Sequence, residues 1–320
     1  MKMKSLNLHL KIIFFTAELF IRGLLHYIYA KYLLRNILEQ SSSNLNIKIL
    51  VCTIIVPELF AYPYATLAGK NLTGQHLRLL TLVCAVMPVN DSLIDNTEIA
   101  LNRLEKLFIE YDSISPKNYN ELLQTQLLNM IYQSDLIHEN LFIPTLQNVH
   151  NAQIESRRQI IDTPNLEDLQ EITANKGGYT AILFAYCVKN TLSTEEINFL
   201  YAVGYWFQLL DDLVDCKKDS KEEITTLANS LSNTEFQLLL DKQNRKIIHQ
   251  IKKLPYSLWK KSTFLFKLFY LEKLSFAFFE EYNRNPQKSK SALVETIKIL
   301  ASIRHAYKEI LTFQDPLQSS

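Results

Sequence analysis

The chain has 320 residues, which is enough for one large domain or two of ordinary size. It contains only six glycines and nine prolines, against about 22 and about 16 at average usage, which argues against all-β folds and α/β folds with glycine-rich turns. The 34 basic and 33 acidic side chains give a net charge of +1, so nucleic acid is not an expected partner.

Residues 1–40 combine an apolar background with six basic and two acidic side chains. Charged residues interrupt every window of spanning length, and no cleavable signal peptide is expected. The segment permits attachment to a membrane surface, although an ordinary packed helix is the simpler interpretation. The four cysteines show neither Cys-x-x-Cys pairs nor metal-ligand spacing, which is typical of free thiols in a cytoplasmic protein.

Apolar residues recur at helical spacing through most of the chain, and no hairpin signal separates alternating runs. Ser193 and Glu196 form a capping box that predicts a long helix running to about Asp219. The pattern predicts a single all-α domain over residues 1–320, with ten or more helices. Breaks are expected at residues 39–46, 57–63, 113–118, 163–164, 177–178, 191–194, 253–255 and 283–290.

A first acidic cluster, Asp91 and Asp95, follows the apolar stretch 79–87. At i and i+4 of a helix, both side chains project from one face, about 5–6 Å apart at Cβ. Taken alone, such a pair is most simply a solvent-facing acidic pair.

A second cluster places Asp211, Asp215 and Asp219 on successive turns of one helical face. The preceding stretch, 202–210, is almost wholly apolar, so the first of these carboxylates emerges from a core helix. Half-buried like charges are costly unless cations neutralise them. Hard oxygen ligands at this spacing suit Mg²⁺, which also binds substrate phosphate oxygens.

The first motif resembles that of the class I isoprenoid synthase superfamily, which comprises trans-prenyl diphosphate synthases and class I terpene synthases. Asp91-Ser-Leu-Ile-Asp95 is similar to the DDxxD motif, with Ser92 in place of the second aspartate. The outer two carboxylates are the ones expected to reach metal, so this departure is tolerable.

The second motif adds to the resemblance. Asp211-Asp212-Leu-Val-Asp215 is similar to the second motif of prenyl diphosphate synthases, and its extension to Asp219 resembles the metal pattern of cyclases. The stretch 175–184, Asn-Lys-Gly-Gly-Tyr-Thr-Ala-Ile-Leu-Phe, resembles a segment whose lysine contacts diphosphate, and is most similar to that of bacterial large terpene synthases.

The resemblance implies an antiparallel helical bundle of the isoprenoid synthase type, with the motifs in a core of about residues 75–220. It implies three Mg²⁺ ions held by catalytic aspartates Asp91, Asp95, Asp211 and Asp215, with Asp219 as a further ligand. The superfamily often forms homodimers, so the resemblance is compatible with a homodimer, and the sequence leaves the oligomeric state open.

Cationic partners for the diphosphate are also expected. Lys176 stands beside two glycines that we expect to break a helix and let backbone N–H groups approach an anion. Arg158, Arg304 and Tyr307 are further candidates by resemblance. For each, a surface role is the alternative.

Aromatic residues, 11% of the chain, could line a pocket in which π faces stabilise a carbocation. The candidates for a substrate pocket are Tyr179, Phe184, Phe207 and Gln208, and core packing is the simpler interpretation of the aromatic set.

These features predict a Mg²⁺-dependent terpene synthase that ionises an allylic prenyl diphosphate and cyclises or eliminates the cation. No Arg-Arg pair follows the first motif, and the next arginine is Arg103, which favours one diphosphate substrate over two. The alternatives are a trans-prenyltransferase that condenses prenyl diphosphates, including the head-to-head type, and a non-catalytic helical binding protein.

Overall fold

The computed structural model describes residues 21–162 and 164–284. Within these ranges every regular element is a helix, which confirms the all-α prediction. Residues 21–33 are helical, and the later elements are α2 (Arg35–Gln40), α3 (Ser43–Val56), η1 (Pro57–Ala61), α4 (Tyr62–Ala68), α5 (Gly74–Ile94), α6 (Leu101–Ile109), α7 (Tyr119–Tyr132), α8 (Glu139–Ser156), α9 (Arg158–Ile161), α10 (Leu166–Tyr186), α11 (Thr194–Lys221), α12 (Leu227–Ser230), α13 (Asn233–Lys253) and α14 (Leu258–Arg284).

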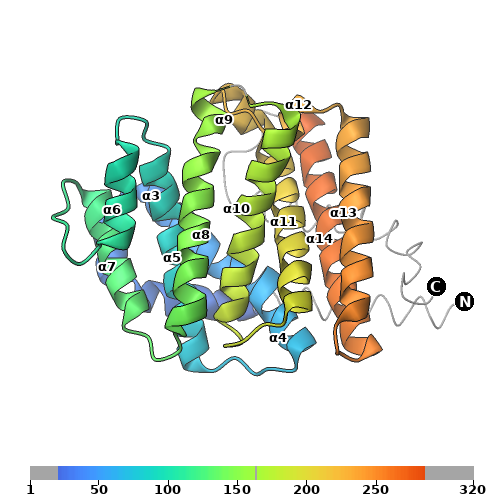
Figure 1. The fold of residues 1–320 in the computed structure, drawn as a ribbon, viewed down its shortest axis with the longest axis horizontal. Coiled ribbons are helices and arrows are strands. Elements are labelled where there is room, and N and C mark those ends of the chain that lie inside the picture. Colours follow the sequence, from blue (N-terminus) through green and yellow to red (C-terminus); the bar gives the residue numbers. More distant parts are fainter. Residues whose placement is uncertain (1–20, 163, 285–320) are drawn as a thin grey trace, which may run out of the picture.

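The helices form a bundle in which α10 packs between α8 and α11 (Figure 1). On the far side of α11 lie α13 and α14, and on the other side of the bundle α5 packs against α3 and α7. One hydrophobic cluster runs through these elements, from Leu34 to Leu271. The helices that carry the two acidic clusters, α5 and α11, are therefore both anchored in the same core.

Local sequence signals explain several helix ends. The Ser193–Glu196 capping box is present and opens α11, which runs to Lys221, close to the predicted end. The expected breaks at 39–46, 113–118, 163–164, 191–194 and 253–255 also separate helices in the structure.

The expected break at residues 57–63 is wrong, because the backbone continues there as the π-helix η1 between α3 and α4. In a π turn the hydrogen bond spans five residues, as from the Tyr62 N–H to the Pro57 carbonyl. The prolines are absorbed into one continuous rod of residues 43–68.

Two helical stretches of the described chain, Ser43–Ala68 and Gly74–Ile94, are long and apolar enough to cross a membrane by length and composition alone. The most apolar 18-residue windows in these stretches have mean hydropathies of 1.7 and 1.5. The window in Gly74–Ile94 is 67% buried, as expected for a core helix, whereas the window in Ser43–Ala68 is only 39% buried.

The expected break at Gly177 and Gly178 is also wrong, since both lie inside the uninterrupted helix α10. Their role is to let α10 and α11 cross closely: a Cβ on Gly177 would lie 2.2 Å from the carbonyl oxygen of Gly204. A Cβ on Gly204 would lie 2.1 Å from the Gly177 carbonyl oxygen, and one on Gly178 would meet the Tyr201 ring at 2.4 Å. These glycines are required by tertiary packing, which outweighs their low helix propensity.

We expect Gly204→Ala to lower the free energy of unfolding by about 1–3 kcal/mol, because the added methyl group overlaps the backbone of α10. Urea denaturation followed by circular dichroism measures this change. Gly74→Ala is the matched control, since a Cβ there meets nothing within 4 Å. A Gly204→Ala protein as stable as the wild type would show that the helices do not depend on this close approach.

Candidate active site

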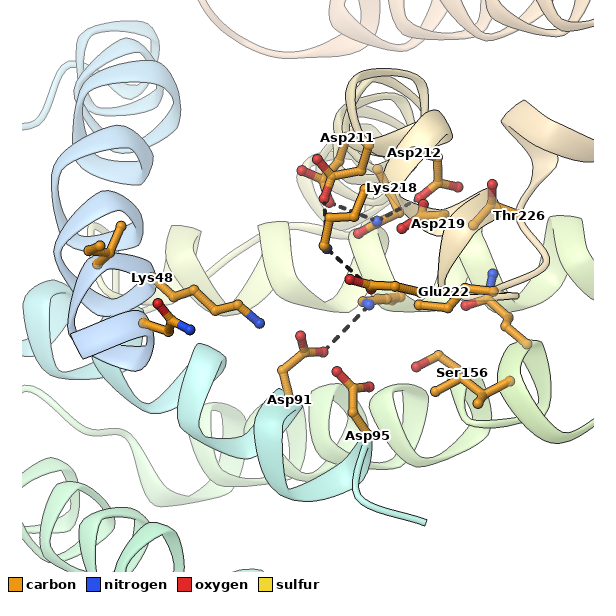
Figure 2. A pocket seen from close by; sticks show the side chains of 18 residues that line it. Lys48, Asp91, Asp95, Ser156, Asp211, Asp212, Lys218, Asp219, Glu222 and Thr226 are labelled. Carbon is orange, nitrogen blue, oxygen red and sulfur yellow. Dashed lines mark hydrogen bonds and ion pairs between the residues drawn. The ribbon is translucent and has the colours of Figure 1, made fainter. Parts of the chain in front are cut away.

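A polar pocket of about 430 Å³ opens between the helices that carry the two acidic clusters. The C-terminal end of α5 forms one wall and the C-terminal half of α11 forms the opposite wall (Figure 2). Lys176 of α10 lies between them, and α3, the end of α8, α9 and residues 224–226 complete the lining. The two motifs, about 120 residues apart in sequence, thus face one pocket.

The first motif occupies the last turn of α5. Asp91 and Asp95 both line the pocket, and the Asp95 N–H donates to the Asp91 carbonyl oxygen at 2.9 Å. Ser92 instead faces α7, where its Oγ accepts a hydrogen bond of 3.3 Å from Asn120 Nδ2. The position that departs from DDxxD is therefore outside the pocket lining.

Buried polar contacts hold this turn in place. Asn90 Oδ1 lies 3.0 Å from His150 Nδ1 of α8, and both side chains are 1% exposed. Burial lowers the pKa of His150 to about 4, so the imidazole is neutral at pH 7. Just beyond the motif, the buried Arg157 guanidinium donates to the carbonyl oxygens of Asn96 and Ile99 at 2.9 Å each. Asp91 and Asp95 are thus fixed against α8 from both sides.

The second motif contributes four aspartates from α11. Asp211, Asp215 and Asp219 line the pocket as predicted from their spacing, and Asp212 lines it as well. Gln208, one turn earlier, donates to Asp211 Oδ2 at 3.3 Å and to Asp212 Oδ1 at 3.0 Å.

Lys176 connects the two walls. Its Nζ lies 3.6 Å from Asp91 Oδ1 (Figure 2). Burial alone would lower its pKa, but the surrounding carboxylates, chiefly Asp91 and Asp211, outweigh burial and raise the pKa of Lys176 well above its ordinary value. The ammonium group therefore stays charged and acts as the internal counterion of the site.

Negative charge is in excess in the pocket. Its described lining carries seven carboxylates against three lysines, a formal excess of four negative charges. Burial, followed by the neighbouring carboxylates, raises the pKa of Asp95 and of Asp219 to about 6 each. The lining carboxylates are Asp91, Asp95, Asp211, Asp212, Asp215, Asp219 and Glu222, and the lysines are Lys48, Lys176 and Lys218.

Asp212 is a buried acid, and one of its carboxylate oxygens is unsatisfied within the described part of the chain. It is 7% exposed, and its Oδ2 has no hydrogen-bond partner among the described residues. Burial raises the pKa of Asp212 to about 7, a shift that Gln208 only partly offsets. An oxygen in this state is free to accept a ligand that brings positive charge or a proton.

The donor set suits a hard divalent cation. Carboxylates on two facing helices are the ligands that Mg²⁺ prefers, together with water and phosphate oxygens. Among the described residues, no three His, Cys, Asp or Glu side chains are already gathered closely enough to enclose a metal ion. The arrangement therefore fits ions that are held jointly by the protein and a bound phosphate, and does not fit an all-protein cage.

Other predicted residues lie elsewhere. Arg158 is outside the pocket lining and pairs with Glu155 and Asp168, at 2.7 Å each. Arg304 and Tyr307 fall outside the described residues.

Of the four residues predicted for a substrate pocket, only Gln208 lines this one. Phe184 and Phe207 pack instead against Phe60 of η1, with ring centroids 6.1 Å apart in each case. Tyr179 packs edge-on against Tyr201. These aromatic side chains thus pack against other rings and lie outside the lining of this pocket.

The structure adds residues that the sequence analysis did not single out. Lys218 and Glu222 continue the face of Asp211 and Asp215 at i+7 and i+11, so the same helical periodicity predicts them. Lys218 Nζ lies 3.3 Å from Asp215 Oδ2. Lys48 reaches the pocket from α3 (Figure 2), and no spacing in the sequence relates it to either motif.

Comparison with known proteins finds similarity only at the level of structure. No protein-family model matches the chain, and no curated protein matches it. Among solved structures, a geranyltransferase from Legionella pneumophila is similar with a TM-score of 0.46 and 13% sequence identity, over 84% of this chain and 99% of that one. The function therefore has to be argued from the site itself.

We expect Asp212→Asn to stabilise the protein at alkaline pH. Unfolded aspartate titrates near 3.9, whereas folded Asp212 titrates near 7. The ionised group therefore destabilises the fold fully above about pH 7, and this penalty disappears as pH falls towards 4. Chemical denaturation should show a gain on the order of 1–3 kcal/mol at pH 8 and almost none at pH 4.

Asp135→Asn is the control, because Asp135 is exposed and lies outside the pocket lining. We expect no pH-dependent difference for it. An Asp212→Asn protein that is less stable than the wild type at pH 8 would contradict the electrostatic account.

Proposed function

We propose that this protein is a Mg²⁺-dependent class I terpene synthase that ionises an allylic prenyl diphosphate and then cyclises the cation or eliminates a proton. The observation that carries the proposal is the convergence of two aspartate-rich helix ends and Lys176 on one pocket. The non-catalytic alternative leaves unexplained why so many like charges are held half-buried together.

The residues that would hold Mg²⁺ are Asp91 and Asp95 on one wall and Asp211, Asp215 and Asp219 on the other. Bound Mg²⁺ supplies positive charge that stabilises the diphosphate leaving group. The aspartates serve as ligands rather than as acids or bases, and they keep their places because α5 and α11 are rigid core helices.

Lys176 would donate hydrogen bonds to the diphosphate once ligand binding releases it from Asp91. Its raised pKa keeps it protonated, so it offers a full charge where negative charge develops on the leaving oxygen. The C–O bond would break with its electron pair remaining on the diphosphate. The allylic cation, either directly or after a ring closure that moves the positive charge to another carbon, would then lose a proton from a neighbouring carbon to the released diphosphate.

The first arginine that follows the first motif in the sequence supports a single diphosphate substrate, because it is already paired elsewhere. Arg103 pairs with buried Glu121 of α7, with Nη2 2.6 Å from Oε2. No arginine is among the described residues that line the pocket, which leaves three lysines as its cations.

Lys48 favours a second candidate function, a trans-prenyltransferase. It enters the pocket from α3, a helix that carries neither motif, and its ammonium group is placed to hold the diphosphate of a second substrate. Incubation with an allylic prenyl diphosphate, isopentenyl diphosphate and Mg²⁺ separates the two: a longer diphosphate identifies the transferase, and a hydrocarbon or alcohol product identifies the synthase.

We expect Asp91→Asn and Asp211→Asn each to lower Mg²⁺-dependent diphosphate release from C10–C35 prenyl diphosphates by at least about 100-fold, because each removes a charge from one wall. Thermal unfolding checks that both variants remain folded. Asp135→Asn should retain wild-type activity. Undiminished turnover in either site variant would overturn the proposed role of the two motifs.

Ligand binding offers a test that does not need turnover. Inorganic diphosphate with Mg²⁺ should raise the Tm of the wild-type protein, by a stabilisation of about 2.7 kcal/mol when the ligand is at 100 times its Kd. Lys176→Met should lose most of this increase, because the lysine contacts the anion. An equal Tm increase in Lys176→Met would show that Lys176 is not part of the diphosphate site.

A further inference from the structure

Two neighbouring helices carry a stripe of exposed apolar side chains. On the helix of residues 21–33, Leu25 is 61% exposed and Ile28 57%, and on α3 Ile47 is 61% exposed. The spacings are i, i+3, i+4, i+7 and i+11 on the first helix and i, i+4 and i+8 on α3, so each set lies along one side of its helix. We call these residues the apolar face: Ile21, Leu24, Leu25, Ile28, Tyr32, Ile47, Val51 and Ile55.

The two stripes belong to helices in direct contact. A Cβ on Gly23 would lie 3.4 Å from Cγ2 of Ile54, which is ordinary van der Waals contact, so residues 21–33 pack against α3. Ile49 and Thr53, on the opposite side of α3, are fully buried. α3 is thus apolar on the side that faces the core and also on the side that faces solvent.

This excess of exposed apolar surface distinguishes the rod of residues 43–68 from the core helix α5. Its most apolar window has a mean hydropathy of 1.7 but is only 39% buried, against 1.5 and 67% for α5. Contiguous exposed apolar patches of this kind mark surfaces that bind a partner.

The charges around the apolar face are basic. Residues 21–38 and 41–57 contain no Asp or Glu. Lys31 and Lys48 are exposed there. Exposed Arg35 pairs with exposed Glu39, with Nε 2.8 Å from Oε1, and buried Glu58 is paired with Arg22 and His26. An apolar stripe flanked by lysine and arginine is the composition of helices that lie in the interface of anionic membranes.

We propose that the apolar face binds the surface of an anionic lipid bilayer, with the helix of residues 21–33 and α3 lying along the interface. A second copy of the chain fits less well, because a twofold contact would bring Lys31 and Lys48 of one copy towards those of the other. The argument rests on surface residues and does not depend on the reaction.

The apolar face borders the candidate active site, since Ile47 and Lys48 line the pocket as well as flanking this surface. A protein bound in this way would hold the pocket beside the lipid, where long prenyl chains partition. This consequence, unlike the binding itself, rests on the proposed function.

Vesicle co-sedimentation of the full chain tests the proposal. We expect binding to vesicles of phosphatidylglycerol and phosphatidylcholine, much weaker binding to phosphatidylcholine alone, and weakening as salt is raised. Leu25→Ser/Ile28→Ser should lower the partition coefficient by at least about tenfold, and Lys31→Glu by roughly tenfold. The control Ile109→Ser/Leu238→Ser removes side chains that are 58% and 60% exposed on α6 and α13, and should bind as the wild type does.

Asp91→Asn should bind vesicles as the wild type does, which separates this proposal from the proposed function. Thermal unfolding shows whether each variant is folded. The proposal is overturned if the wild type does not bind anionic vesicles, or if the folded Leu25→Ser/Ile28→Ser variant binds as tightly as its control. It is also overturned if the same variant instead changes the oligomeric state measured by light scattering, which would identify a second copy as the occupant.

Discussion

The close crossing of α10 and α11 is the constraint on which the site depends. Gly177 and Gly204 carry no side chain, so the two backbones lie very close together. A methyl group on either glycine would overlap the carbonyl group of the other. Lys176 precedes one of these glycines, and Gln208 stands one turn after the other and binds Asp211 and Asp212. The counterion and the second acidic motif are therefore placed by the same contact, and a wider crossing would separate them.

Electrostatics makes the site incomplete without positively charged ligands. Protein interiors rarely hold like charges together unless something neutralises them. Here Lys176 and Lys218 neutralise only part of the acidic cluster, and burial, followed by the neighbouring carboxylates, raises the pKa of Asp95, Asp212 and Asp219. Holding these carboxylates together lowers the stability of the folded protein. Clusters of ionisable groups with shifted pKa values are typical of functional sites.

Helical periodicity predicts the all-α fold and the grouping of Asp91 with Asp95 and of Asp211 with Asp215, because those relations are local. The same rule, carried further along α11, reaches Glu222. It could not predict Lys48, whose place depends on how α3 packs against α5. Gly177 and Gly178 were expected to break the helix, because intrinsic propensity disfavours glycine there. Only the neighbouring helix reveals why they are retained.

The contact between Ser92 and Asn120 has a consequence for how related chains are recognised. The Ser92 side chain points towards α7 and not into the acidic pocket. The residue type at the second position of the first motif is therefore determined by the packing of α5 against α7. A small hydroxyl residue fits the contact between α5 and α7, whereas an aspartate at this position would place its charge against α7. A pattern of two adjacent acids would therefore miss this helix end, whereas a spacing of four between acidic positions describes Asp91 and Asp95, which both face the pocket.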